Sequence, residues 1–190
     1  VEVDATFNSS TGEITPDTAL GDGVKAVSYK YVDAAGNESG QSPSLNVTID
    51  TDAPDAPTGG LHSASDSGTA GDLITNDTTP TLTGTGVAGD TLTLREGNTE
   101  LGSVLVGSNG QWSFTPTAVW AEGSHALDLI ATDPAGNASS ATALTVVIDT
   151  QPPVIVINNP GITATSTEIT GTAEPLANIS VTVGTEVPGT

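Results

Sequence analysis

The chain has 190 residues, 35% of them hydrophobic and only 3% aromatic, with 22 glycines and 12 prolines. Three Lys and Arg stand against 23 Asp and Glu, so the formal net charge of −20 excludes nucleic acid and anionic membrane surfaces as partners. Cysteine and methionine are absent, which excludes disulfides, thiol nucleophiles and thiolate zinc sites. No apolar run reaches the roughly 18 residues that span a bilayer, so we expect no membrane insertion. The abundant Val, Ile, Leu and Thr favour an all-β fold.

The first clear element is a strand over residues 45–49, where apolar and polar residues alternate. It runs into an acidic stretch over residues 50–57, which reads Asp-Thr-Asp-Ala-Pro-Asp-Ala-Pro. Because the prolines fix φ and lack a backbone donor, this stretch cannot continue a sheet or start a helix. We therefore interpret residues 50–57 as a short, stiff joint between two domains.

After the joint the pattern predicts seven short strands and no helix. The strands are expected near residues 58–61, 81–85, 91–95, 103–106, 112–115, 126–132 and 143–148, with a long polar loop over 63–77. Asn109-Gly110 predicts a hairpin, Gly97-Asn98 a weaker one, and residues 134–137 a turn. Strands at this spacing indicate a Greek-key sandwich.

Internal repetition divides the chain into units. The motif Asp-x-x-Gly-Asn at residues 33–37 recurs 100 residues later, at 133–137. Two further motifs recur, Ile49-Asp50-Thr51 as Ile148-Asp149-Thr150 and Thr83-Gly84-Thr85 as Thr170-Gly171-Thr172. A repeat of about 100 residues has the size of an immunoglobulin-type sandwich. The predicted domains are the C-terminal half of a first unit (1–52), a complete unit (53–150) and the N-terminal part of a third (151–190).

The joint is a candidate cation site. Asp50 and Asp52 lie on one side of an extended chain, since side chains alternate with a period of two. Two carboxylates about 5 Å apart repel by roughly 3 kcal/mol at an effective dielectric of 20, and a cation between them removes that cost. Counting strands up and down places the turns at 86–90, 107–110 and 133–137 at the same end as the joint. Asp133 and Asn137 should therefore meet Asp50, Asp52 and, further along, Asp55 around calcium, which prefers oxygen ligands.

Other acidic turns are candidate calcium ligands as well. Asp33 and Asn37 form the equivalent turn of the first unit, and Asp149 stands at the second joint. Ordinary turn chemistry is the competing explanation, because Asp and Asn bond their own backbone and Gly supplies positive φ. The polar loop carries three more candidates for a second cation, Asp66, Asp72 and Asp77, with a flexible surface loop as the alternative.

The sequence contains no pattern typical of catalysis. His62 and His125 have no nucleophile at a suggestive spacing. A Gly-x-Gly-x-x-Gly run at residues 84–89 continues into a strand, whereas a dinucleotide site needs a helix there. Trp112 and Trp120 are expected to fill the core, with carbohydrate stacking as an alternative for Trp120. We therefore expect no enzyme activity.

The run from Ser65 to Thr85, the turn Asp133-Pro134-Ala135-Gly136-Asn137 and the Ile-Asp-Thr-x-x-Pro joint together resemble tandem bacterial Ig-like repeats. Such repeats build giant type I-secreted surface adhesins, of the type of the very long non-fimbrial adhesin of Salmonella and of biofilm-associated proteins. The resemblance implies Ig-like Greek-key sandwiches in an elongated extracellular rod, stiffened by calcium near the joints. The third unit departs from the pattern, because Gln151 stands where the first joint has Asp52 and the Ser-Asp-Ser-Gly loop is missing.

The resulting functional prediction is a calcium-stiffened spacer of a secreted bacterial adhesin, contacting neighbouring repeats. Attachment to host cells or other surfaces would then reside in other parts of the parent protein, from which the abrupt start at Val1 leads us to expect a fragment. The alternative is a ligand-binding module whose loop 62–78 or Trp120 contacts glycan or protein. A further hypothesis is strand exchange, since residues 153–190 supply the early strands of a unit and residues 1–50 the late ones.

Overall fold

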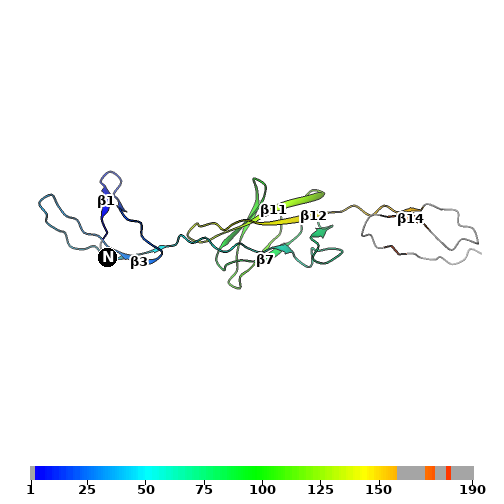
Figure 1. The fold of residues 1–190 in the computed structure, drawn as a ribbon, viewed down its shortest axis with the longest axis horizontal. Helices are drawn as coiled ribbons and strands as arrows, with labels where there is room; N and C mark the ends of the chain where they lie inside the picture. Colours follow the sequence, from blue (N-terminus) through cyan, green and yellow to red (C-terminus); the bar gives the residue numbers. More distant parts are fainter. Residues whose placement is uncertain (1–2, 158–169, 174–178, 181–190) are drawn as a thin grey trace, which may run out of the picture.

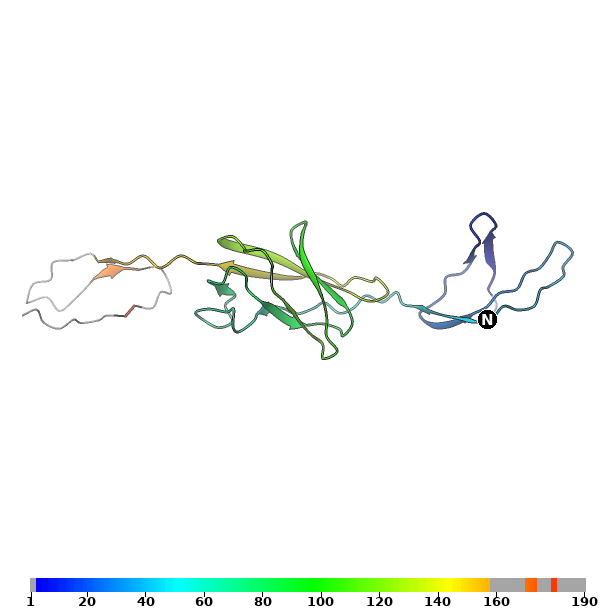
Figure 2. The same cartoon turned by 180° about the vertical axis from the view of Figure 1, so that it is seen from behind.

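The computed structural model describes residues 3–157, 170–173 and 179–180, and it contains strands and turns but no helix in these residues. Figures 1 and 2 show the complete sandwich in the middle of the described chain, with two-stranded pieces on either side of it. Among the described residues, no helix is long and apolar enough to cross a membrane. Most of the predicted third unit, residues 151–190, lies outside the described residues.

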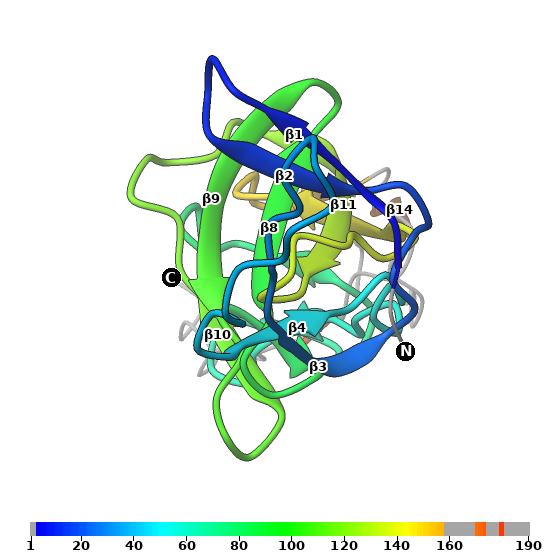
Figure 3. The same cartoon turned by 90° about the vertical axis from the view of Figure 1, so that its left-hand side faces the viewer.

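Eight strands form the central unit. They are β5 (Gly60–Leu61), β6 (Ile74–Thr75), β7 (Leu82–Thr85), β8 (Thr91–Glu96), β9 (Thr99–Leu105), β10 (Gln111–Phe114), β11 (Gly123–Thr132) and β12 (Thr142–Ile148). One sheet has the order β10-β7-β5 and the other β6-β12-β11-β8-β9, and only the pair of β6 with β12 is parallel. Figure 3, viewed along the long axis, shows β9, β8 and β11 side by side. This confirms the predicted all-β, immunoglobulin-like sandwich.

Two sequence predictions about connections are wrong. Asn109-Gly110 is not a hairpin within one sheet, because β9 pairs with β8 while β10 pairs with β7 in the other sheet. The hairpin lies at the weaker signal, Gly97-Asn98, where Glu96 opposes Thr99. The short strand β6 was missed inside the predicted loop, because two residues are too few to show any alternation.

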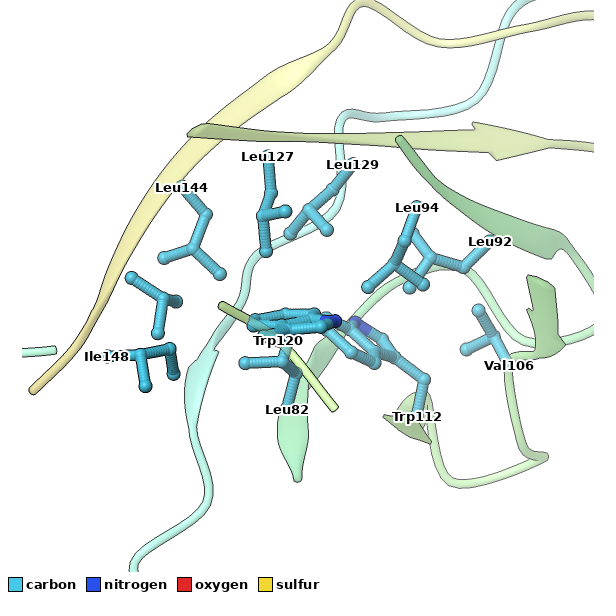
Figure 4. Packing of buried hydrophobic residues seen from close by; sticks show 11 residues of the cluster. Leu82, Leu92, Leu94, Val106, Trp112, Trp120, Leu127, Leu129, Leu144 and Ile148 are labelled. Carbon is cyan, nitrogen blue, oxygen red and sulfur yellow. The ribbon is translucent and has the colours of Figure 1, made fainter. Parts of the chain in front are cut away.

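The core lies between the two sheets. Alternate residues of the long strands point into it, including Leu82, Leu92, Leu94, Leu127, Leu129, Val146 and Ile148 (Figure 4). Fully burying each such side chain stabilises the fold by about 1.5–3 kcal/mol. Trp112 and Trp120 complete this cluster, and the Trp112 Nε1 donates to the Thr58 carbonyl oxygen at 3.0 Å. Only glycine fits at Gly84, because a Cβ there would collide with the same carbonyl.

Three pairs of strands flank the central unit. On the N-terminal side β1 (Ala5–Asn8) pairs with β2 (Glu13–Pro16), and β3 (Gly23–Val27) pairs with β4 (Leu45–Ile49). On the C-terminal side β13 (Val156–Ile157) pairs with β14 (Gly171–Thr172). The apolar side chains of these pairs stay largely exposed, among them Phe7, Val24, Leu45 and Val156.

Candidate functional site

The joint is fastened to the unit that precedes it. Thr51, which follows β4, donates its backbone N–H and its Oγ1 hydroxyl to Asp22 Oδ1, each at 3.0 Å. The second joint repeats the arrangement, since the Thr150 N–H and hydroxyl donate to Glu122 at 3.1 and 2.7 Å. Sequence reasoning missed these acids, although each directly precedes the glycine that opens the penultimate strand of its unit. Each joint therefore leaves its own unit in a fixed direction.

The same joint is also fastened to the unit that follows it. Asn137 donates its Nδ2 to the Asp50 carbonyl oxygen at 3.0 Å, and the Thr142 hydroxyl donates to the Pro57 carbonyl oxygen at 2.6 Å. One residue later, the Thr58 N–H donates to the Thr85 carbonyl oxygen at 2.9 Å and starts the sheet. Both ends of the joint are thus held, and the segment between them contains Pro54, whose φ is fixed.

Ordinary turn chemistry accounts for the shape of the Asp-x-x-Gly-Asn motif. Asp133 Oδ1 accepts N–H groups from Ala135, Gly136 and Asn137 at 2.7–2.9 Å, and Oδ2 accepts the Asn137 side-chain amide at 2.8 Å. These bonds, the Asn137 side chain first, lower the pKa of Asp133. Asn137 therefore serves the joint as a donor, with its amide nitrogen rather than its oxygen facing Asp50.

The first unit repeats this turn with the same bonds. Asp33 accepts the N–H groups of Ala35 and Asn37 and the side-chain amide of Asn37, at 2.8–2.9 Å. The Asn37 side chain is again the largest cause of a lowered Asp33 pKa. Both aspartates are consequently held ionised, which suits a calcium ligand and a turn equally well.

An acidic pocket lies where the joint meets the central unit. It measures about 460 Å³ and is lined by four aspartates and small apolar residues, namely Asp50, Asp52, Ala53, Pro54, Val87, Ala88, Asp90, Asp133 and Pro134. The structure thus brings the turn before β8 and the turn after β11 to the joint, as strand counting predicts. Asp55 and Asn137 are not among the residues that line this pocket. Four of the residues that line this pocket are acidic, and no basic residue lines it.

Asp90 is the member of this pocket that sequence reasoning missed. Its residue is only 2% exposed, and its Oδ2 is buried without a hydrogen-bond partner. Burial raises the pKa of Asp90, and the charge of Asp133 raises it further. A buried, unpaired carboxylate is costly, so this position calls for a proton or a cation. Since Asp90 follows Gly89 in a turn, its sequence context looks like that of any turn aspartate.

The three aspartates of the polar loop are used by the loop itself. Asp66 Oδ2 accepts the Gly71 N–H at 2.6 Å and Asp72 Oδ1 accepts the Ile74 N–H at 2.9 Å. Asp77 accepts the Thr79 N–H and the Ser65 hydroxyl, both at 2.9 Å. Internal hydrogen bonds therefore order this loop, although the Asp66 Oδ1 is buried without a partner.

Within the described residues, no group of three or more His, Asp or Glu side chains is already drawn together closely enough to hold a metal ion. At the second joint, Asp149 Oδ1 accepts the Gln151 N–H at 3.1 Å, just as Asp50 Oδ1 accepts the Asp52 N–H at 3.2 Å. Calcium at the joints and in the loop therefore stays a prediction. The first joint has the best case, because the buried and unsatisfied Asp90 Oδ2 belongs to a pocket that three further aspartates also line.

The aromatic and histidine side chains have structural roles. Trp120 is 8% exposed in the core, so the alternative of carbohydrate stacking from a loop is wrong for this residue. The His125 ring packs on Trp120 at 5.1 Å between centroids, and its Nδ1 lies 3.0 Å from Glu96 Oε1. His62 lines a separate open pocket beside Trp112, together with Thr83 and Ser113, and no acid is among the residues that line it.

Comparison with known proteins identifies the central unit. Residues 53–150 match the profile of the bacterial Ig-like domain family. Among solved structures, the fibronectin(III)-like modules of Clostridium thermocellum CbhA are 17% identical with a TM-score of 0.42, covering 74% of this chain and 70% of that one. A tetra-tandem repeat from the extending region of a large adhesion protein is 21% identical with a TM-score of 0.40, covering 89% of this chain but 44% of that one. A search of curated protein sequences gave no match.

Proposed function

Because this chain belongs to the bacterial Ig-like domain family, we propose that it is a spacer of a secreted, cell-surface adhesin whose joints are stiffened by calcium. The observation that carries the proposal is the acidic pocket at the first joint, where Asp90 is buried beside Asp133 without a partner. The spacer holds an attachment site at a distance from the cell, and that site lies in other parts of the parent protein. We propose that the parent protein is an adhesin of the same type as the very long non-fimbrial adhesin of Salmonella and the biofilm-associated proteins.

Electrostatics give the cation its role. At the first joint, burial and the charge of Asp133 both make the ionised form of Asp90 costly. A divalent cation in the pocket converts this repulsion into attraction between the joint and the two turns of the following unit. Asp50 and Asp52 would supply the ligands from the joint, and Asp90 and Asp133 those from the unit.

The hydrogen bonds of the joint explain why one ion suffices to stiffen it. Thr51 is tied backward to Asp22 and Pro57 is tied forward to Thr142, so the only freedom lies in the few residues between. An ion that links Asp52 to Asp133 bridges that interval and removes its remaining hinge motion. Extracellular modules bind calcium with dissociation constants of about 10⁻⁴–10⁻³ M, so the sites would fill after export and stay empty in the cytosol.

Thermal unfolding with calcium and with excess chelator, together with small-angle X-ray scattering, tests the proposal. Calcium should raise the melting temperature and narrow the distribution of particle shapes, and Asp52→Ala should abolish both effects. Asp52 is preferable to Asp133 for this purpose, because Asp133 also holds its turn together. If neither the melting temperature nor the scattering responds to calcium, the proposal is wrong, and the aspartates serve only to stabilise their turns.

A glycan array with the full chain separates the spacer from the ligand-binding alternative. With Trp120 buried, that alternative rests on the loop of residues 62–78. We expect no glycan to be retained.

A further inference from the structure

His125 of β11 lies at the edge of the core, close to the residues that hold the second joint. Its side chain is only 12% exposed, and its ring packs on the ring of Trp120 with 5.1 Å between centroids and 31° between planes. Trp120 begins a short segment, residues 120–122, in which the Ala121 carbonyl oxygen also contacts His125. The last residue of this segment, Glu122, accepts the hydrogen bonds of the second joint. The His125 ring therefore connects the core to the segment that fastens the joint.

Both ring nitrogens of His125 face hydrogen-bond acceptors. Nδ1 lies 3.0 Å from Glu96 Oε1, and Nε2 lies 2.9 Å from the Ala121 carbonyl oxygen. A carbonyl oxygen can only accept, and so can an ionised carboxylate. Because a neutral imidazole carries one N–H, its other nitrogen would turn a lone pair toward an oxygen lone pair. Only the imidazolium, with a proton on each nitrogen, donates both bonds.

The third neighbour of the ring favours the same charge state. A cation within about 6 Å of the centroid of a tryptophan ring is attracted by the negative face of that ring. The rings of His125 and Trp120 lie within this distance and are closer to parallel than to perpendicular. A carboxylate, a carbonyl oxygen and an indole face thus all stabilise a positive charge on His125.

Glu96 is the charged group that faces His125 from β8. Arg95 and Asp128 oppose each other in the register of β8 and β11, on the other face of this sheet, because neighbouring residues of a strand point to opposite faces. On the other side of β11 lies β12, in which no residue is titratable. The carboxylate of Glu122 is bonded to the second joint. The charge opposite the His125 ring is therefore that of Glu96.

We propose that His125 is a proton-dependent brace of the second joint. While its ring is protonated, it holds Glu96 through Nδ1 and Ala121 through Nε2, and so ties the segment of Ala121 to β8 and β11. Glu122, the next residue, is thereby kept in position to accept the N–H and the hydroxyl of Thr150. When the proton leaves, repulsion replaces one of the two bonds, and the joint loses part of its support. Histidine changes charge between pH 5 and 8, so the joint should be held more firmly in a mildly acidic medium than in an alkaline one.

Glu96→Gln tests the brace, because a glutamine suits a neutral ring. Its side-chain amide can donate to the Nδ1 of a neutral His125, while the ring N–H at Nε2 still donates to Ala121. At about pH 5.5 the natural chain should melt about 2–4 °C above the variant, and at about pH 8.5 it should melt below the variant. Excess chelator in every sample makes this outcome independent of calcium at the joints.

Hydrogen exchange of the Thr150 amide, normalised to its rate in an unfolded peptide at the same pH, measures the second joint itself. Its protection should be greater at about pH 5.5 than at about pH 8.5 in the natural chain, and equal at both in Glu96→Gln. His62→Gln is the matched control. The His62 Nδ1 accepts the Ala64 N–H at 3.2 Å, a bond that needs a neutral ring nitrogen, so this substitution should not cost more stability in acid than in alkali.

A melting difference between the natural chain and Glu96→Gln that is the same at both pH values overturns the inference, because the contact is then merely structural. Protection of the Thr150 amide that does not follow the pH also overturns it, since the brace then does not reach the joint. Tryptophan fluorescence at each pH checks that the central unit stays folded, because Trp112 and Trp120 both lie in its core.

Discussion

Replacing Asp90 by Asn separates the cost of its buried charge from the benefit of a bound cation. With chelator present, the variant should be at least as stable as the natural chain, because a neutral amide is less costly to bury than a carboxylate and no longer repels Asp133. With calcium present, the natural chain should be the more stable of the two. Calcium would neutralise the unsatisfied carboxylate of Asp90, and the variant has no such carboxylate. The substitution should thus have opposite signs under the two conditions.

The size of the effect follows from binding linkage. At a free calcium concentration 100 times the dissociation constant, binding to the folded state alone raises the free energy of unfolding by about 2.7 kcal/mol. For a unit of this length, each kcal/mol shifts the melting temperature by about 4–8 °C, so the natural chain should gain roughly 10–20 °C. Asp90→Asn should lose most of that gain.

Differential scanning calorimetry in calcium and in chelator measures the change in melting temperature that Asp90→Asn causes under each condition. Asp55→Asn is the matched control, because Asp55 belongs to the same joint but does not line the pocket. The control should melt like the natural chain in both conditions. If Asp90→Asn melts lower than the natural chain in chelator and keeps the full calcium gain, Asp90 is not the group that the cation relieves, and the reasoning fails.

Three further outcomes follow from burial, pKa and hydrogen bonding. Leu144→Ala should lower the free energy of unfolding in urea by about 2–5 kcal/mol, whereas Leu45→Ala in dilute protein should change it by less than about 0.5 kcal/mol. Because the pKa of Asp133 is lowered below 3.8, its contribution to stability is present above that pH and lost as the pH falls through the folded-state pKa. Asp133→Asn should therefore flatten the acid limb of the melting temperature measured against pH. Trp112→Phe leaves the Thr58 carbonyl without its donor and should cost about 1–3 kcal/mol by urea unfolding, with Trp120 as the remaining probe.

The sequence predicted the sandwich well because its strands are half-buried and therefore alternate. Leu92 and Leu94 of β8, and Leu127 and Leu129 of β11, stand two residues apart and point to the same face. The two-residue strand β6 has no such period, and its pairing with β12 is set by tertiary contacts. Asn109-Gly110 led to the wrong prediction of a hairpin, because a tight turn specifies that the chain changes direction but not which sheet the next strand joins.

Part of the candidate site could also be predicted, and part could not. The meeting of Asp50, Asp52 and Asp133 follows from strand parity, which a repeat unit of known size makes easy to count. Asp90 could not be singled out, because its burial and its nearness to Asp133 are set by the tertiary structure and leave no mark on its own turn. Asp22 and Glu122, which accept the hydrogen bonds of the two joints, stand at equivalent positions of two units. This repetition is recognisable in the sequence only once their hydrogen bonds are known.

Comparison of the two joints separates the hydrogen-bond framework from the proposed cation. Thr150 is tied to Glu122 as Thr51 is tied to Asp22, and Asp149 caps Gln151 as Asp50 caps Asp52. The direction in which the chain leaves a unit is thus set by bonds that survive the change from Asp52 to Gln151. What that change removes is one carboxylate, and with it part of the repulsion that a divalent cation would relieve. We therefore expect the second joint to bind calcium more weakly than the first, and to loosen first when calcium falls below the millimolar range.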